Sequence, residues 1–286
     1  MGSVRWAFNV AGWAPGRAEW SAATRAVQPE EKERIGRFHF RGDARASLAG
    51  RLMLRRLLCR HTGVPWSQLL LRRTDKGKPF LAAAGGGDGG GLVFNVSHQG
   101  RFTVLAAEPA AAPDAALGCD VARAVRRAGA PPPAQFFSTM RRQFTAAEWA
   151  FICGPGTERQ QLARFHRCWA LKESFVKAEG VGIGFSLQRA SFTCRPAEVP
   201  AGGAVADTLL HVDGTPETRY RFEESLLDAE HVVAVAVRAA GPAAEPPPTF
   251  ELLTAGQLLD CAESLTPEDP AYCDRYMAAE ERDDGF

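Results

Sequence analysis

The order of helical and strand-like segments constrains the fold of this chain more than any other sequence feature. Helical segments followed by a group of three strand-like segments occur twice along the 286 residues. Residues 94–108 and 222–238 are the corresponding parts of the two groups, with a weak residue match. A chain of this length can bury one large core or two modest ones. The order therefore suggests one α+β unit present in two copies.

Helix signals come first in the proposed first copy. Pro29 suits the first position of a helix, and Glu30 and Glu31 favour the positive end of the helix dipole. A second helix is expected from about Ala44 to Arg60, because its leucines form an apolar stripe. Gly63 is expected to cap the C-terminal end of that helix.

Strand signals follow these helices. Residues 69–73 are expected as a short strand, and residues 74–79 as the turn after it. Residues 93–97, 102–107 and 116–121 are expected as three further strands.

The proposed second copy begins with two helix signals. Thr145 and Glu148 have the spacing of a capping box, which places a helix start at about Thr145. A long helix is expected over residues 158–179, ending at Gly180.

Strands are again expected after the helices. Residues 209–212 and 219–223 flank Asp213-Gly214, which is a hairpin signal. Residues 231–237 are β-branched and apolar almost throughout, which is typical of a buried strand.

These signals divide the chain into residues 1–122 as a first half, 123–240 as a second half, and 241–286 as a linker and C-terminal tail. Three segments are expected as loops from their Ala, Gly and Pro content: 82–91, 128–134 and 239–248. The acidic residues 280–284 are expected to form a frayed tail.

The charge balance limits the class of partner. Lys and Arg number 34 and Asp and Glu number 33, a formal net charge of +1. We therefore expect no broad binding to nucleic acid. No apolar run approaches membrane-spanning length and no signal peptide is visible, so we expect a cytosolic protein without a membrane partner. The seven cysteines contain no C-x-x-C pair, which argues against zinc.

A carboxylate and an ammonium are spaced for joint action in the long helix. Glu173 precedes Lys177 by four residues, so both side chains lie on one helix face. A carboxylate can hold Mg²⁺ and an ammonium can hold phosphate. The alternative is a solvated ion pair, which the spacing alone favours.

Two other segments carry groups suited to an anion. Lys76 and Lys78 flank Gly77, so that charge and backbone can both approach a ligand closely. At a predicted strand end, Ser97 and His98 can donate hydrogen bonds. The alternatives are an exposed basic turn and a capped turn with a surface histidine.

Asp120 follows Leu117-Gly-Cys in an otherwise apolar strand segment. A carboxylate in such a strand is costly unless it is paired or bound to a metal. The alternative is a residue at the strand end that faces water.

Five segments, taken in order, resemble the motifs of 4′-phosphopantetheinyl transferases of the Sfp type. They are Lys76-Gly-Lys-Pro-Phe80, Phe94-Asn-Val-Ser-His98, Leu117-Gly-Cys-Asp-Val121, Phe144-Thr-Ala-Ala-Glu148 and Trp169-Ala-Leu-Lys-Glu-Ser-Phe-Val-Lys177. The resemblance covers roughly residues 34–185. Residues 4–8 and 28–36 further resemble the animal cytosolic member of this family.

The resemblance implies a reaction and a fold. Enzymes of this family move 4′-phosphopantetheine from coenzyme A to a serine of an acyl or peptidyl carrier protein, such as the carrier domain of fatty acid synthase. Adenosine 3′,5′-bisphosphate is released. The implied fold is α+β, with two similar halves in a pseudo-two-fold arrangement and the active site in the cleft between them. We expect a monomer, because the two halves already supply such an interface.

The resemblance also implies roles for individual residues. Asp120 and Glu173 would be the Mg²⁺ ligands. Glu173 and Lys177 would be catalytic, Glu173 as general base and Lys177 by neutralising the pyrophosphate. The residues that would bind coenzyme A are Arg34, Arg73, Thr74, Lys76, Gly77, Lys78, Asn95, Ser97, His98, Glu173 and Lys177.

One position departs from the bacterial pattern, in which Asp-x-Glu gives a third carboxylate. Here Ala122 stands in its place and cannot bind a metal. Water or Gln99 would complete the coordination, since Mg²⁺ commonly keeps several waters.

Two other functions stay open: a catalytically idle scaffold that binds coenzyme A, and a Mg²⁺-dependent hydrolase of its pyrophosphate. Carrier domains tend to be acidic, so a basic strip would help the chain to recognise them. Candidate residues for that strip, which solvated surface residues would equally explain, are Arg123, Arg126, Arg127, Arg141 and Arg142.

Overall fold

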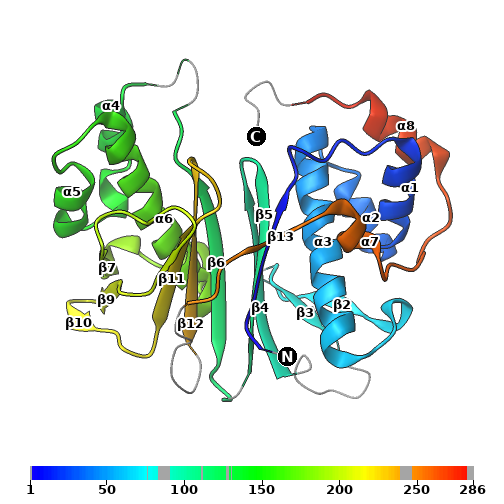
Figure 1. The fold of residues 1–286 in the computed structure, drawn as a ribbon, viewed down its shortest axis with the longest axis horizontal. Coiled ribbons are helices and arrows are strands. Elements are labelled where there is room, and N and C mark those ends of the chain that lie inside the picture. Colours follow the sequence, from blue (N-terminus) through cyan, green and yellow to red (C-terminus); the bar gives the residue numbers. More distant parts are fainter. Residues whose placement is uncertain are drawn as a thin grey trace.

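Two sheets of four strands pack face to face, and helices cover the outer face of each sheet (Figure 1). The computed structural model describes residues 2–75, 77–82, 91–110, 112–126, 129, 131–238 and 247–281. Helices and strands both contribute substantially, so the predicted α+β class is confirmed.

The first half contains three helices and one of the sheets. The helices are α1 (Arg17–Arg25), α2 (Pro29–Ile35) and α3 (Arg41–Thr62). The strands run in the order β13-β1-β5-β4, with β13 (Glu251–Leu253), β1 (Val4–Asn9), β5 (Phe102–Pro109) and β4 (Leu92–Gln99). As predicted, α2 begins at Pro29, and Gly63 caps the C-terminal end of α3 with φ 70°.

A small hairpin stands beside this sheet. It consists of β2 (Leu71–Arg73) and β3 (Pro79–Leu81), which pair antiparallel after a short 3₁₀ segment, Trp66–Gln68. The hairpin presents the turn at residues 74–78.

The second half, which in the structure begins with β6 at Ala116 and not at residue 123, contains the other four-stranded sheet, a small three-stranded sheet and three helices. The large sheet has the order β6-β12-β11-β8, with β6 (Ala116–Arg123), β12 (His231–Arg238), β11 (Arg221–Leu226) and β8 (Ala204–Val205). The small sheet has the order β10-β9-β7, with β10 (Thr215–Pro216), β9 (Leu209–Val212) and β7 (Ala190–Thr193). The helices are α4 (Pro133–Thr139), α5 (Ala146–Ile152) and α6 (Glu158–Glu179).

The helix signals of the second half are confirmed. Thr145 and Glu148 form the predicted capping box at the start of α5. A second capping box, from Thr157 and Gln160, starts α6, and Gly180 ends it at φ 65°. Three 3₁₀ segments flank these helices: Arg141–Gln143, Gly182–Gly184 and Leu187–Arg189.

One predicted strand pairing is wrong. The turn at Asp213-Gly214 is present, but β9 pairs across it with β10 and not with residues 219–223. Residues 221–226 form strand β11, which pairs along its whole length with residues 232–237 of β12 and, on its other edge, with β8. The apolar strand β12 offers a six-residue partner that buries Phe222, whereas the tight turn leaves its own second strand only two residues long.

Apolar side chains from both large sheets fill the space between them. They come from β1 and β5 on one side and from β6 and β12 on the other: Ala7, Phe102, Val104, Ala106, Leu117, Cys119, Val121, Val233, Val235 and Val237. One buried cation crosses this interface. Arg5 contacts Glu108 of its own sheet at 2.5 Å and Glu223 of the opposite sheet at 2.7 Å.

Side-chain amides join the two sheets along the edge where β4 meets β6. Asn95 Oδ1 accepts a hydrogen bond from the Cys119 backbone N–H at 3.1 Å, and Gln99 Oε1 accepts one from Arg123 N–H at 2.7 Å. These bonds stand where a backbone ladder would run in a continuous sheet, and they fix the register of β4 on β6.

The C-terminal segment returns to the first half. Strand β13 pairs parallel with β1, and α7 (Ala255–Leu259) and α8 (Pro270–Ala278) contact α3 and α1. The expected loop at 82–91 lies mostly outside the described residues, as do most of the expected linker at 239–248 and residues 282–286 of the expected tail. Glu280, also placed in that tail, forms a β-bridge with Phe40.

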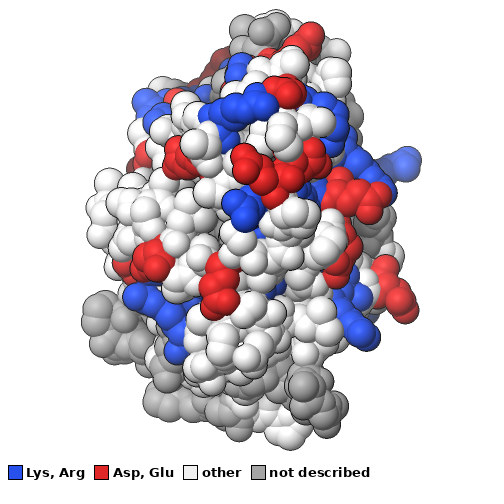
Figure 2. Space-filling model, turned by 90° about the vertical axis from the view of Figure 1, so that its right-hand side faces the viewer, with Lys and Arg blue, Asp and Glu red and all other residues white. Residues whose placement is uncertain are grey.

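Charged side chains of both signs are interspersed on the face that lies at the right of Figure 1 (Figure 2). In the part of the chain that the structure describes, no helix is long and apolar enough to span a membrane.

Candidate functional site

A cavity of about 900 Å³ lies between the two halves. Its first-half wall comes from α2, α3, β4 and the β2–β3 hairpin, and its second-half wall from α6 and the segment after it. The polar and charged residues that line it are Arg34, Ser47, Arg51, Arg73, Thr74, Asp75, Lys78, Asn95, His98, Gln143, Glu173 and Lys177.

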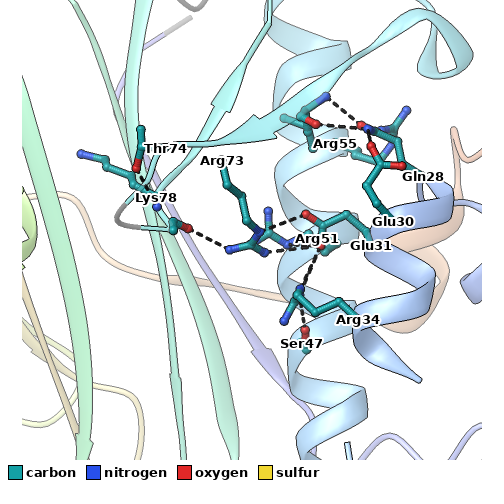
Figure 3. Close-up of polar contacts among 12 residues, drawn as sticks. Gln28, Glu30, Glu31, Arg34, Ser47, Arg51, Arg55, Arg73, Thr74 and Lys78 are labelled. Atoms are coloured by element: carbon teal, nitrogen blue, oxygen red, sulfur yellow. Dashed lines mark hydrogen bonds and ion pairs between the residues drawn. The ribbon is translucent and has the colours of Figure 1, made fainter. Parts of the chain in front are cut away.

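Three arginines of the first-half wall share one buried carboxylate (Figure 3). Arg34, Arg51 and Arg73 lie 3.2, 3.3 and 3.2 Å from the carboxylate of Glu31. Burial alone would raise the pKa of Glu31, but the arginines outweigh it and the pKa is lowered. Because three cations meet one anion, this wall keeps a surplus of positive charge.

The turn at residues 74–78 adds another cation. Thr74 N–H donates to Lys78 O at 2.9 Å, and Lys78 N–H donates to Thr74 Oγ1 at 3.1 Å. Gly77 has φ 80°, which favours glycine, and its carbonyl accepts from Arg73 at 2.8 Å. Burial lowers the pKa of Lys78, whose ammonium has no ion-pair partner among the described residues. Lys76, also predicted to bind the ligand, lies outside the described residues.

The predicted residues Ser97, Asp120 and Lys177 meet across the edge where β4 and β6 join. Lys177 Nζ donates to Asp120 Oδ1 at 2.5 Å and to Ser97 Oγ at 2.9 Å. Ser97 Oγ in turn donates to Asp120 Oδ1 at 2.9 Å. Burial lowers the pKa of Lys177, but the attraction of Asp120 outweighs it and the pKa is raised. Lys177 is therefore held in its charged form.

Gly118 allows α6 to approach β6 closely enough for these contacts. A Cβ atom at this position would lie 1.9 Å from Ser174 O and 2.4 Å from Ala178 N. Both atoms belong to the backbone of α6, so only glycine permits the observed spacing.

Glu173 lies on the same face of α6 as Lys177, as predicted, and lines the cavity. Burial, followed by the negative charge of Asp120, raises the pKa of Glu173, while Lys177 acts in the opposite direction. Two carboxylates that repel one another beside a cation form a site where a further cation is favoured.

A second opening of about 330 Å³ adjoins the large cavity. The two share four lining residues: Val96, His98, Glu173 and Lys177. Asp120, Gln99 and Trp169 line only the second opening. The charged cluster thus stands where a large basic cavity meets a smaller entrance.

The neighbours of this cluster also define what it can do. His98 is exposed at the rim of both openings, but partial removal from water, then the charges of Lys177 and Arg34, lower its pKa, so its imidazole is neutral near pH 7 and can donate a single hydrogen bond. Ala122 is fully buried among apolar residues and lines neither opening. Gln99 Oε1 already accepts from the Arg123 backbone.

The structure brings together every predicted site residue that it describes. The sequence does not predict Arg51 as a site residue, and it predicts Glu31 only as a residue at a helix start. A signal for Arg51 was present, since it interrupts the leucine stripe of α3 and lies four residues after Ser47, on the same helix face.

No group of three or more His, Cys, Asp and Glu side chains suited to a metal ion occurs in the described ranges. Asp120 and Glu173 are the carboxylates available at the cluster. Mg²⁺ is commonly held by one or two carboxylates together with substrate phosphates and water, so this pair fits Mg²⁺ without a third carboxylate.

Two family models match the chain. Residues 11–110 match the model described as 4′-phosphopantetheinyl transferase, N-terminal. Residues 116–236 match the model of the 4′-phosphopantetheinyl transferase superfamily. The first match spans the basic wall and the second spans Asp120, Glu173 and Lys177.

Curated relatives agree with these matches. The L-aminoadipate-semialdehyde dehydrogenase-phosphopantetheinyl transferase of Homo sapiens is 43% identical over 292 residues, covering 98% of this chain and 93% of the relative. The protein of the same name from Xenopus laevis is 42% identical over 291 residues, covering 98% and 94%. A phosphopantetheinyl transferase of Thraustochytrium sp. is 39% identical over 236 residues, covering 81% and 77%.

Proposed function

The chain belongs to the 4′-phosphopantetheinyl transferase superfamily, and we propose that it transfers 4′-phosphopantetheine from coenzyme A to a serine of a carrier protein. The transfer converts an apo carrier to its holo form and releases adenosine 3′,5′-bisphosphate. The observation that carries the proposal is the Asp120, Glu173 and Lys177 cluster at the junction of two openings.

Coenzyme A fits the chemistry of the large cavity. Its 3′-phosphate and pyrophosphate are anions, and the first-half wall offers Arg34, Arg51, Arg73 and Lys78. Guanidinium groups match phosphate geometry because each presents several N–H donors in a fixed plane. A volume of about 900 Å³ also lies within the usual range of small-molecule pockets.

The second opening suits the acceptor. In phosphoryl transfer the attacking and leaving oxygens lie roughly in line on opposite sides of phosphorus. If the nucleotide leaves on the side of the basic cavity, the serine hydroxyl must approach the β-phosphorus from the other side. We therefore assign the opening beside Trp169 and Gln99 to the serine of the carrier.

Asp120 and Glu173 would hold Mg²⁺, with water completing its coordination, since the predicted alternative Gln99 has its Oε1 engaged by Arg123 N–H. The ion would supply neutralisation of the charge on the transferred phosphoryl group. Lys177 would contribute a second positive charge to the pyrophosphate, and its raised pKa keeps it protonated.

Glu173 is the proposed general base for the serine hydroxyl. A general base must reach the proton that it removes, and the Glu173 side chain lines both openings, so it can contact a hydroxyl that enters through the second one. His98 is better suited to donating a hydrogen bond to phosphate, because its neutral ring is a weak base when the pKa is lowered.

A carrier-modification assay tests the function. The protein is incubated with coenzyme A, Mg²⁺ and an apo carrier domain such as that of fatty acid synthase, and the carrier is weighed by mass spectrometry. Appearance of the holo carrier is expected. Binding of coenzyme A without transfer would support the idle scaffold, and free phosphopantetheine in the absence of carrier would support the hydrolase.

The pseudo-two-fold arrangement, the three-part division of the chain, the cytosolic location and the monomeric state stay proposals. The long helices α3 and α6 each cover the outer face of one large sheet, which supports two similar halves (Figure 1). Strand β6 pairs with β12 although the proposed division assigns nearly all of it to the first half, so a boundary before Ala116 agrees better with the sheets.

The basic strip for an acidic carrier also remains a proposal. Arg123 pairs with Glu230 at 3.1 Å, which reduces its availability. Arg141 and Arg142 are exposed, so a carrier could reach them, but exposure is the one feature that supports this role. Arg127 lies outside the described residues.

A further inference from the structure

The helix that carries Glu173 also carries a buried ion pair that the proposed chemistry does not use. Lys172 Nζ lies 2.9 Å from Glu148 Oε2, and both side chains are 0% exposed. Removing two charges from water is costly unless good geometry and further hydrogen bonds compensate. The partners of each group therefore show what the pair holds in place.

Lys172 holds one wall of the large cavity. Its ammonium donates to Leu187 O at 2.8 Å and also to Ala190 O. Leu187 and Phe185 line the cavity from this wall segment. The wall is thus fastened to the residue that directly precedes Glu173.

Glu148 connects the ion pair to the start of α5 and to strand β7. Its Oε2 accepts from Thr145 N–H at 2.8 Å, within the α5 capping box, and its Oε1 accepts from Phe192 N–H of β7 at 3.0 Å. The pair therefore joins α5, α6 and β7 to the cavity wall. Since Lys172 and Glu173 are adjacent, a rotation of α6 that released Lys172 would also displace Glu173.

We propose that Lys172 and Glu148 are positioning residues of the transfer reaction, which hold the wall at residues 180–187 against coenzyme A and set the rotation of α6. This proposal rests on the proposed function, because coenzyme A is taken as the ligand. Neither residue touches the reacting atoms.

A second buried ion pair on α6 provides a matched control. Arg167 Nε lies 2.6 Å from Glu224 Oε2, with side chains 4% and 0% exposed. Arg167 also donates to the backbone carbonyls of Pro196 and Ala197. This pair fastens α6 to β11 and to a loop that lines neither opening, so it has the same burial without the contact to the wall.

Lys172→Met and Arg167→Met are compared by melting temperature, by calorimetric titration with coenzyme A and Mg²⁺, and by steady-state kinetics. Both variants should lower the melting temperature, because each leaves a buried carboxylate unpaired. Lys172→Met alone should weaken coenzyme A binding, by up to about tenfold, because the ligand must then order a wall that has lost its hydrogen bonds from Lys172. It should raise the KM for coenzyme A without changing the KM for the carrier.

The double variant Lys172→Met with Glu148→Gln separates stability from positioning. It removes both charges, and the amide oxygen of Gln can still accept a hydrogen bond from Thr145 N–H or Phe192 N–H, so part of the melting temperature should be restored. The Leu187 and Ala190 carbonyls still lack their donor, so weak coenzyme A binding should persist. If the methionine variants do not fold, Lys172→Arg, which keeps the charge and changes the reach, gives the same comparison.

Equal losses of coenzyme A affinity in the Lys172 and Arg167 variants would overturn the proposal. So would affinity like that of the unaltered protein in a double variant with a restored melting temperature. If the unaltered protein binds coenzyme A but never modifies a carrier, the proposed function fails while the binding comparison still decides the role of the wall.

Discussion

Substitution of Gly118 by alanine tests the close contact between β6 and α6 on which the site depends. The new Cβ would lie 1.9 Å from Ser174 O, whereas Cβ atoms essentially never come nearer than 3.0 Å to such a neighbour. Helix α6 must therefore move away from β6 by about 1.1 Å. Because the clashing atoms are backbone, no change of side-chain rotamer relieves the contact.

The shift acts directly on the groups proposed to be catalytic. Lys177 Nζ lies 2.5 Å from Asp120 Oδ1, so a displacement of about 1.1 Å lengthens that contact beyond hydrogen-bond distance and moves Glu173 away from Asp120. Misplacement of catalytic groups by 1 Å can reduce a rate by about 100-fold, and overpacking of a core costs about 1–3 kcal/mol. We expect losses of that order in kcat/KM and in the free energy of unfolding.

The assay measures formation of holo carrier at several coenzyme A concentrations, with urea unfolding of the same preparation. Gly256→Ala is the control, since a Cβ there meets its nearest atom at 3.9 Å, an ordinary contact, and activity should not change. A folded Gly118→Ala protein with kcat/KM within about threefold of the unaltered protein would refute the reasoning.

Three further predictions concern charged groups. Glu173→Gln should abolish holo-carrier formation, and retained activity would remove Glu173 from both proposed roles. Without Mg²⁺ the same variant should have a higher melting temperature at pH 7. The reason is that burial and Asp120 raise the pKa of Glu173, so its ionised form destabilises the fold above that pKa. Lys177→Met should weaken coenzyme A binding by about 10- to 100-fold in calorimetric titration, and unchanged affinity would count against its contact with phosphate. His231 accepts from Arg101 N–H through Nε2 and contacts Asp228 through Nδ1, and burial lowers its pKa despite Asp228. The neutral form of His231 therefore stabilises the fold above about pH 6.5, and this contribution is lost as the pH falls through the lowered pKa. In urea unfolding between about pH 4 and 7, the free energy of unfolding should depend less on pH in His231→Gln than in the unaltered protein. Identical pH dependence in the two proteins would contradict this prediction.

Local signals predicted the elements that hold the site. The capping box at Thr145 and the glycines after α3 and α6 act through contacts a few residues apart, so the sequence near each helix end determines where the helix stops. The Glu173–Lys177 spacing needed only the period of a helix. The expectation that Asp120 and Glu173 lie together came from the family resemblance and not from spacing, and the direct contact of Lys177 with Asp120 is seen only in the structure.

Contacts between distant segments escaped prediction. Glu31 resembles any acidic residue in a first helical turn until α3 and the β2–β3 hairpin bring Arg51 and Arg73 to it. The pairing of β11 depends on β12 and β8, which compete with the turn beside β9. Such choices are decided by burial in the assembled sheet, which a single strand sequence does not contain.

The return of strand β13 to β1 has a consequence for synthesis on the ribosome. The first sheet receives its last strand only after every strand of the second half has been translated. At about 5–20 residues per second, the β1 edge waits for roughly ten seconds or more before its partner emerges. Chaperones that cover exposed strand edges would therefore meet the nascent chain at β1, in the half that is made first and finished last.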